Sequence, residues 1–311
     1  MAFATRRRFL TIAAAAAGMA ALPAAARANA APLYQWRGVA LGADASITLA
    51  HPRAEAIVAR TLAEIARLEA IFSLHRPDSA LARLNANGRL EAPPFELLEC
   101  LSLCAAVHRA SAGAFDPTVQ PLWALHAESH ARGRAPGDDE IAALLPRIGW
   151  GRVQFDPGVI ALARPGMALT LNGVAQGVIA DRVADMLETE GLRNILINTG
   201  EFRALGGHPG GGDWPIRLDD AAATPAPLRD RALASSGALG TTFDTAGDVG
   251  HILDPRSGRP APARWRLVSV TAPRAGLADA LSTAACLLDE AGIDGLLSRF
   301  PEARLAGLDH G

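Results

Sequence analysis

Two oxygen-bearing side chains at helical spacing are the first candidates for chemistry. Asp279 and Thr283 lie four residues apart in the otherwise apolar run LADALSTAACLL. On a helix, this spacing puts the carboxylate and the hydroxyl on the same face. Hard oxygen donors of this kind suit Mg²⁺. The same pair is also compatible with a solvated helix face or a local hydrogen bond, so both interpretations stay open.

The histidines offer one candidate general base. His251 lies between Gly250 and an apolar stretch in GHILDP, and an imidazole titrates near neutral pH. A structural histidine held by hydrogen bonds is the alternative. His126 and His130 also lie four residues apart, but they lack the glutamate of an HExxH zinc motif. We therefore predict that these two are surface residues.

The stretch between Leu169 and Glu201 predicts a strand, a glycine turn and a helix that would position such groups. We expect an apolar strand that ends at Asn172 and Gly173, a helix that Gly191 stops, and a second strand over 195–198. Backbone amides at a helix N-terminus favour a phosphate-bearing ligand. An ordinary strand–helix connection without a ligand is the alternative.

Elements nearer the N-terminus follow from periodicity and turn residues. Alternating apolar residues between Tyr34 and Leu49 predict two short strands that join near Gly42, and an apolar stripe after Pro52 predicts a helix. A second helix over 95–111 leads into the sequence GAFDPTVQPLW. Asp116 precedes a proline there, so its carboxylate is expected in an extended turn.

The C-terminal part repeats the order of strand and helix, with a strand over 267–271 and a helix over 276–288. No internal repeat and no linker long enough to separate domains is visible. We therefore predict an α+β fold in which residues 32–311 form a single body. This body would contain two halves with strand–helix units, and its sheets would be mixed and largely antiparallel.

Composition excludes several classes of function. The formal net charge of the 311-residue chain is -2, which argues against nucleic acid as a partner. Every one of the 30 basic residues is Arg, so a lysine Schiff base and a Walker A loop are excluded. The chain also lacks a GxSxG elbow, and no GxGxxG follows a strand. Cationic contacts to phosphate must therefore come from Arg, a metal or backbone amides.

The N-terminus has the pattern of an export signal. Arg6 and Arg7 precede an Ala-rich apolar run, and small residues near Ala28 offer cleavage sites. We predict a twin-arginine signal peptide over residues 1–30 and a periplasmic protein. The apolar run is short for the alternative, a membrane anchor. No cysteine lies near the cleavage region, so a lipoprotein is not expected. Cys100 and Cys104 lie four residues apart in an apolar helical segment, and we expect them to be small buried hydrophobes.

Six segments together resemble the family of ApbE-like FAD:protein FMN transferases. In chain order these segments are FSLHRPDSALARLN, GAFDPTVQPLW, LTLNGVAQGVIADRVADML, ASSG, GHILDPRSG and ADALST. The resemblance covers nearly the whole chain after the signal segment. It implies a flavin transferase that uses FAD as substrate and depends on Mg²⁺. Such an enzyme attaches FMN through phosphate to a Thr or Ser of an exported or membrane-bound acceptor protein and releases AMP.

The resemblance also assigns roles to particular residues. Asp279, Thr283 and the backbone carbonyl of Gly173 would ligate Mg²⁺, and His251 falls in the motif that supplies the catalytic histidine. The positions that match the FAD site of relatives are Phe72, Asn85, Ala114, Phe115, Asp116, Thr170, Gln176, Asp181 and Ile252.

Two residues depart from the family pattern in the glycine turn. Thr170 stands where many relatives have Asp, and Gln176 stands where they have Lys. A cation and an anion are thus replaced together, and Gln can still hydrogen-bond a flavin or a phosphate. The LNGxAQG form is similar to a periplasmic branch that includes the flavin transferase of nitrous-oxide reduction clusters. The resemblance leaves monomer and homodimer open.

Two other functions remain compatible with the same motifs. One is a periplasmic FAD-binding or storage protein without transferase activity. The other is a Mg²⁺-dependent FAD pyrophosphatase, in which water replaces the acceptor hydroxyl. In the transferase, a base and a stabilised leaving group are both needed because Ser and Thr hydroxyls are weak nucleophiles at neutral pH.

Overall fold

The computed structural model describes residues 31–40, 42–218 and 226–310. The twin-arginine segment predicted over residues 1–30 lies outside the described residues. Among the helices that are described, none is both long enough and apolar enough to cross a membrane.

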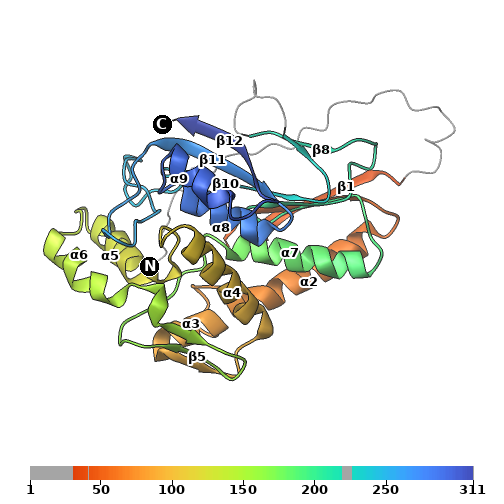
Figure 1. Cartoon of the computed structure of the whole chain (residues 1–311). Helices are drawn as coiled ribbons and strands as arrows, with labels where there is room; N and C mark the ends of the chain where they lie inside the picture. Colours follow the sequence, from red (N-terminus) through yellow and green to blue (C-terminus); the bar gives the residue numbers. More distant parts are fainter. Residues whose placement is uncertain (1–30, 41, 219–225, 311) are drawn as a thin grey trace.

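A seven-stranded antiparallel sheet forms the centre of the molecule (Figure 1). In order across the sheet, its strands are β1 (Leu33–Ala40), β2 (Ala43–Ala50), β6 (Ile195–Asn198), β7 (Phe202–Leu205), β10 (Ala232–Ser236), β11 (Trp265–Ala272) and β12 (Arg304–His310). Strands distant in sequence are therefore neighbours, with β2 beside β6 and β7 beside β10. The predicted pair of strands that join near Gly42 is confirmed as β1 and β2.

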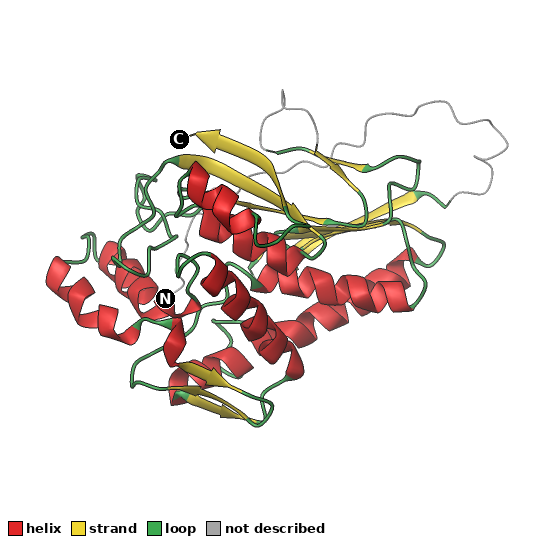
Figure 2. Ribbon diagram, viewed as in Figure 1, coloured by secondary structure: helices red, strands yellow, loops and turns green. Residues whose placement is uncertain are grey.

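Helices cover one face of this sheet (Figure 2). Three of them pack closest to it: α2 (Ala54–Phe72), α7 (Ala175–Thr189) and α8 (Ala275–Ala285). The remaining helices are α3 (Ala80–Asn87), α4 (Phe95–Ala110), α5 (Gln120–Ala131), α6 (Asp138–Leu144) and α9 (Glu290–Leu297), with short 3₁₀ turns η1 (Pro117–Val119), η2 (Leu145–Arg147) and η3 (Trp150–Arg152). The large hydrophobic core lies between these helices and the sheet.

Two smaller sheets complete the α+β architecture. One sheet contains β3 (Arg89–Glu91), β5 (Val159–Leu162) and β4 (Val153–Phe155), and the other contains β8 (Trp214–Ile216) and β9 (Ala226–Leu228). Trp214 and Leu228 of the second one pack on Phe202 and Leu233, which forms a separate small core. The predicted fold class, α+β with largely antiparallel sheets, is confirmed.

The helices α7 and α8 approach each other unusually closely through glycines. A Cβ on Gly177 would lie 2.4 Å from the Ala275 carbonyl carbon, so only glycine fits there. The Asp181 carboxylate accepts hydrogen bonds from the backbone N–H groups of Ala275 (2.8 Å) and Gly276 (2.9 Å). It therefore caps the N-terminus of α8 and fixes the orientation of this helix against α7.

One predicted strand is wrong, because residues 169–172 form no strand. The Asn85 side-chain amide donates to the Leu169 carbonyl oxygen (2.8 Å), and its oxygen accepts from the Leu169 N–H (2.7 Å). The Thr170 N–H donates to the Pro117 carbonyl oxygen (2.8 Å). These contacts satisfy the backbone groups that a sheet would otherwise pair. The second predicted half, strand β11 followed by helix α8, is confirmed.

The prediction that His126 and His130 are surface residues is wrong for His126, and His130 is half-buried. His126 is buried, and its Nε2 makes a hydrogen bond of 2.9 Å with the Gly258 carbonyl oxygen. Both imidazole rings stack on Phe243, with centroid distances of 5.4 and 6.0 Å. The two histidines therefore attach α5 to the loop between β10 and β11, a long-range contact that local sequence does not reveal. Cys100 and Cys104 are buried, as predicted; Cys286 is buried as well, and all three are free.

Candidate functional site

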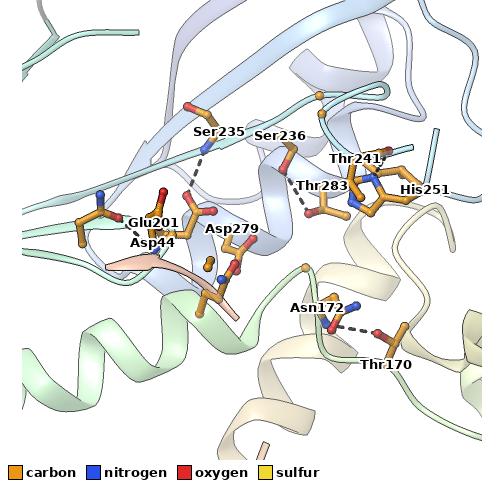
Figure 3. Close-up of a pocket in the computed structure, with 18 of the residues that line it drawn as sticks. Asp44, Thr170, Asn172, Glu201, Ser235, Ser236, Thr241, His251, Asp279 and Thr283 are labelled. Carbon is orange, nitrogen blue, oxygen red and sulfur yellow. Dashed lines mark hydrogen bonds between the residues drawn. The ribbon is translucent and has the colours of Figure 1, made fainter. Parts of the chain in front are cut away.

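A cavity of about 620 Å³ opens where the ends of several strands meet the N-terminus of α7 (Figure 3). Its walls come from β1 and β2, the turn at 114–119, the segment at 170–176, the turn between β6 and β7, the end of β10, and α8. The cavity volume lies within the range of about 300–1,000 Å³ that is usual for small-molecule sites. Segments far apart in sequence thus supply one site.

The three residues predicted to ligate Mg²⁺ come together in this cavity. Asp279 and Thr283 extend from the same face of α8 (Figure 3). Gly173, in the turn before α7, lines the same cavity. A Cβ on Gly173 would lie only 2.8 Å from Thr283 Oγ1. Gly173 therefore brings its backbone against the Thr283 hydroxyl, an approach that any larger residue would prevent.

Asp279 is buried without a strong partner. The residue is only 3% exposed, and its Oδ2 accepts one long hydrogen bond of 3.4 Å from the Gly177 N–H. Burial raises the pKa of Asp279 from an ordinary value of 3.8 to about 8. A carboxylate in this position is poorly compensated by protein groups alone, and a bound cation would compensate it.

Glu201 is a second buried carboxylate in the cavity, and the sequence analysis did not assign it a role. Its Oε2 accepts a hydrogen bond of 3.1 Å from the Ser235 N–H. Burial and the nearby charge of Asp279 raise the pKa of Glu201 well above its ordinary value. The available signal was its place directly after the predicted strand at 195–198 and the turn Thr199–Gly200, but burial beside Asp279 is a tertiary property.

The residues fit a hard divalent cation through mixed oxygen donors. Among the described residues, no group of three or more His, Cys, Asp or Glu side chains could hold a metal. The candidate site instead combines one buried carboxylate, one hydroxyl and one backbone position. Oxygen ligands of these three kinds are typical of Mg²⁺ and Ca²⁺ sites, which leave further positions for water or a ligand phosphate.

His251 lies in the same cavity with its ring held in one orientation. Its Nδ1 is 2.9 Å from the Thr241 carbonyl oxygen, and its backbone N–H donates to that same oxygen at 3.0 Å. A carbonyl oxygen can only accept, so Nδ1 carries the proton in this contact. The neutral ring then has its basic lone pair on Nε2, which is the arrangement required of a general base.

Six of the nine predicted FAD contacts line the cavity. They are Ala114, Phe115, Asp116, Thr170, Gln176 and Ile252. Asp116 has a structural task as well: its carboxylate accepts from the Thr118 N–H (2.9 Å), the Thr118 hydroxyl (2.6 Å) and the Trp150 N–H (3.0 Å). Asp116 itself has the extended backbone that the sequence predicted, and these bonds hold it at the start of the 3₁₀ turn η1.

The other three predicted FAD contacts do not line this cavity. Phe72 is buried in the large core, and Asn85 is engaged with the Leu169 backbone. Asp181 caps α8 and lies near Arg203 and Arg274. Burial nevertheless raises the pKa of Asp181 above its ordinary value. In this structure the three residues support the walls of the site instead of contacting its contents.

Arg37 brings a cationic side chain to the cavity that the sequence analysis did not single out. The sheet register places Arg37 opposite Ser46, and Ser46 opposite Asn198, and all three line the cavity. Arg37 Nε donates to Gln35 Oε1 at 3.1 Å. Because the chain has no lysine, this guanidinium is a natural partner for a phosphate at the cavity mouth. Only the pairing of strands distant in sequence reveals it.

Comparisons with known proteins identify relatives of this chain. The ApbE family profile matches residues 41–305. An FAD:protein FMN transferase of Treponema pallidum (strain Nichols) is 32% identical over 262 residues, which cover 75% of this chain and 71% of that protein. An FAD:protein FMN transferase of Chlamydia pneumoniae is 30% identical over 235 residues, with 72% and 73% covered.

Solved structures show the same architecture. The flavinyl transferase ApbE of Pseudomonas stutzeri, in its apo form, superposes with a TM-score of 0.78 at 25% identity, covering 91% of this chain and 95% of that one. The ApbE protein of Thermotoga maritima gives a TM-score of 0.78 at 27% identity, covering 90% and 97%.

Proposed function

The chain belongs to the ApbE family, and from this premise we propose that it is a Mg²⁺-dependent FAD:protein FMN transferase of the periplasm. It would attach FMN through a phosphoester to a Thr or Ser hydroxyl of an exported acceptor protein. One observation carries the proposal: Gly173, Asp279 and Thr283 converge with the oriented ring of His251 in a single cavity.

The reaction exchanges one bond to phosphorus for another. The acceptor hydroxyl oxygen attacks the phosphorus on the FMN side of the FAD pyrophosphate, and the bond from that phosphorus to the bridging oxygen breaks. AMP leaves with the bridging oxygen and its electron pair. His251 Nε2 takes the hydroxyl proton, which a general base must do because the hydroxyl is a weak nucleophile.

The buried oxygen groups explain why a cation belongs in this reaction. Asp279, Thr283 and the Gly173 backbone would hold Mg²⁺, which when bound neutralises charge on the pyrophosphate and on the departing AMP. Arg37 would pair with a phosphate oxygen from the opposite wall. Gln176, which stands in place of the usual Lys, would hydrogen-bond flavin or phosphate without adding charge.

The apolar part of the cavity suits the aromatic rings of FAD. Phe115, Ile252, Trp123 and Leu253 line it together with the polar groups. Burial of flat rings against such side chains supplies binding energy that is independent of the reacting phosphate. The site therefore combines a surface for the dinucleotide with the groups that act on its pyrophosphate.

The acceptor and the compartment follow from the N-terminal signal pattern and the glycine turn. A twin-arginine signal over residues 1–30 would deliver the protein to the periplasm, and the LNGxAQG turn resembles that of a periplasmic branch of the family. We therefore expect an exported or membrane-bound flavoprotein as acceptor. A gene for such a protein next to the gene for this chain would identify the first acceptor to test.

One incubation separates this function from a storage protein and from an FAD pyrophosphatase. The purified protein is mixed with FAD, Mg²⁺ and an exported flavoprotein produced without flavin, and the products are separated by chromatography. We expect flavin bound covalently to the acceptor together with AMP. Free FMN with AMP would indicate a pyrophosphatase, and unchanged FAD would indicate a storage protein; either result contradicts the proposal.

A further inference from the structure

Two serine hydroxyl groups connect the Asp279 backbone to the Thr283 hydroxyl. Ser282 Oγ lies 3.0 Å from the Asp279 carbonyl oxygen, Ser236 Oγ lies 2.7 Å from Ser282 Oγ, and Ser236 Oγ lies 3.3 Å from Thr283 Oγ1. Ser236 is the last residue of β10, whereas the other three belong to α8. The chain of hydroxyls therefore crosses from helix to sheet and returns to the cavity, and Figure 3 shows its last contact, between Ser236 and Thr283.

The direction of every hydrogen bond in this chain follows from its end. The Asp279 carbonyl can only accept, so Ser282 uses its single proton there. Ser282 must then accept from Ser236, whose single proton is thereby used. Ser236 can in turn only accept from Thr283.

The consequence reaches the candidate metal site. With its proton directed to Ser236, Thr283 Oγ1 presents only lone pairs to the cavity. A hydroxyl that ligates a cation must present a lone pair to it and point its proton away. Thr283 also lies 2.8 Å from the position of a Cβ on Gly173, so its oxygen faces the backbone that would supply another ligand.

We propose that Ser236 and Ser282 are positioning residues that fix the Thr283 hydroxyl as an acceptor toward Mg²⁺. The proposal rests on the proposed function, because it refines the ligand that this function requires. Neither residue needs to touch the metal, and Ser282 is fully buried outside the cavity. Groups that orient metal ligands in this way typically change metal affinity by about 10–100-fold when removed.

A second hydroxyl pair, between β10 and β11, provides a matched control. Ser235 Oγ lies 2.8 Å from Ser269 Oγ, and Ser269 is as fully buried as Ser282. Neither member of this pair has a hydrogen bond to Thr283 among those of the described residues. Ser269→Ala and Ser282→Ala therefore remove equivalent buried hydroxyls, but only Ser282→Ala interrupts the chain that ends at Thr283.

The test is a Mg²⁺ titration of the FAD-loaded protein by calorimetry, with the Mg²⁺-induced rise in melting temperature as a second readout. We expect Ser282→Ala and Ser236→Ala to weaken Mg²⁺ binding by about 10-fold, and Ser236→Thr, which restores the hydroxyl, to recover most of it. Ser269→Ala should bind like the wild type. Melting curves without Mg²⁺ show that each variant folds.

A Thr283→Val background separates the outcomes. Thr283→Val should lose most Mg²⁺ affinity, and adding Ser282→Ala should then have no further effect. If Ser282→Ala and Ser236→Ala bind Mg²⁺ like Ser269→Ala while Thr283→Val is impaired, the positioning role is wrong and the metal site stands. If Thr283→Val binds Mg²⁺ like the wild type, the metal assignment of the proposed function is wrong, and the positioning role falls with it.

Discussion

At the scale of single residues, Asp279 is subject to two opposing requirements. It must be ionised to bind a cation, yet it is buried beside Glu201 with one long hydrogen bond from the backbone. The same burial that costs stability without metal makes the site selective for a compensating charge. Functional sites commonly carry such a cost in stability.

Replacing Asp279 by Asn should separate stability from function. The folded pKa of Asp279 is about 8, above its ordinary value of 3.8, so between these pH values the folded protein binds more protons than the unfolded chain. The stability of the metal-free wild type therefore falls as pH rises through this window. At pH 8, Asp279→Asn should be more stable than the metal-free wild type by about 1–3 kcal/mol, and thermal unfolding measures this difference.

Magnesium supplies the control for this prediction. The ion should raise the melting temperature of the wild type at pH 8 and leave Asp279→Asn unchanged, and the variant should have lost Mg²⁺-dependent flavin transfer. A metal-free Asp279→Asn that is less stable than the wild type at pH 8 would show that the carboxylate stabilises the empty site. The electrostatic account of this residue would then be wrong.

His251 allows a prediction about rate alone. His251→Asn removes the base while the asparagine can still donate to the Thr241 carbonyl oxygen, so kcat for transfer should fall by about 10²–10⁴-fold. The affinity for FAD should stay close to that of the wild type. His75→Asn, at an exposed position outside the cavity, is the control. If kcat of His251→Asn stays within about twofold of that of the control, His251 is not the general base of the transfer.

At the scale of elements, the site depends on how closely α7 and α8 approach. Gly177 lies against the Ala275 carbonyl, and Asp181 on the next turn caps α8. These contacts fix the position of α8 along α7, and with it the position of Asp279 opposite the Gly177 N–H. A shift of α8 relative to α7 would therefore displace the candidate metal ligands without altering any of them.

Gly177→Ala should reveal this dependence. The new methyl group would lie 2.4 Å from backbone atoms, which forces the helices apart and should lower the free energy of unfolding by at least about 1–3 kcal/mol. Mg²⁺ affinity should fall with it. The matched change is Gly295→Ala on α9, where a Cβ meets nothing within 4 Å. This substitution should raise the free energy of unfolding by up to about 1 kcal/mol. Denaturant unfolding measures the free energy of unfolding of both variants. Equal changes in the two variants would show that the close approach of α7 and α8 at Gly177 is not required.

The sequence predicted elements well where one local signal determined them. Alternation determined β1 and β2, and helical periodicity determined α7 until Gly191, where φ is +75°. It failed at residues 169–172, because the Asn85 side chain replaces a neighbouring strand there. The Asp279–Thr283 pair was visible as spacing, whereas Glu201 and Arg37 enter the site only through the pairing of distant strands.

At the scale of the whole molecule, the seven-stranded sheet brings the first and last parts of the described chain together at one cavity. β1 and β2 come from the start of the described chain, and β10 and α8 come from its last third. The cavity is therefore complete only when the entire body has folded. A protein of this kind suits the twin-arginine route, which the N-terminal pattern predicts.

The export prediction concerns the segment that precedes this body. Changing Arg6 and Arg7 to Lys should block export, so that the precursor stays in the cytoplasm. The wild type should accumulate in the periplasm without residues 1–30. Cell fractionation and intact mass of the purified protein measure both outcomes. A periplasmic mature form of the double variant would contradict export by the twin-arginine route.

We propose that this cavity transfers FMN to a protein hydroxyl. The most direct measurement is the intact mass of an exported flavoprotein subunit, produced without flavin, after incubation with the enzyme, FAD and Mg²⁺. We expect a gain equal to FMN less one water, one AMP per modified acceptor, and no gain when the acceptor Thr or Ser is replaced by Val or Ala. An unmodified acceptor beside FAD fully converted to FMN and AMP would contradict the account.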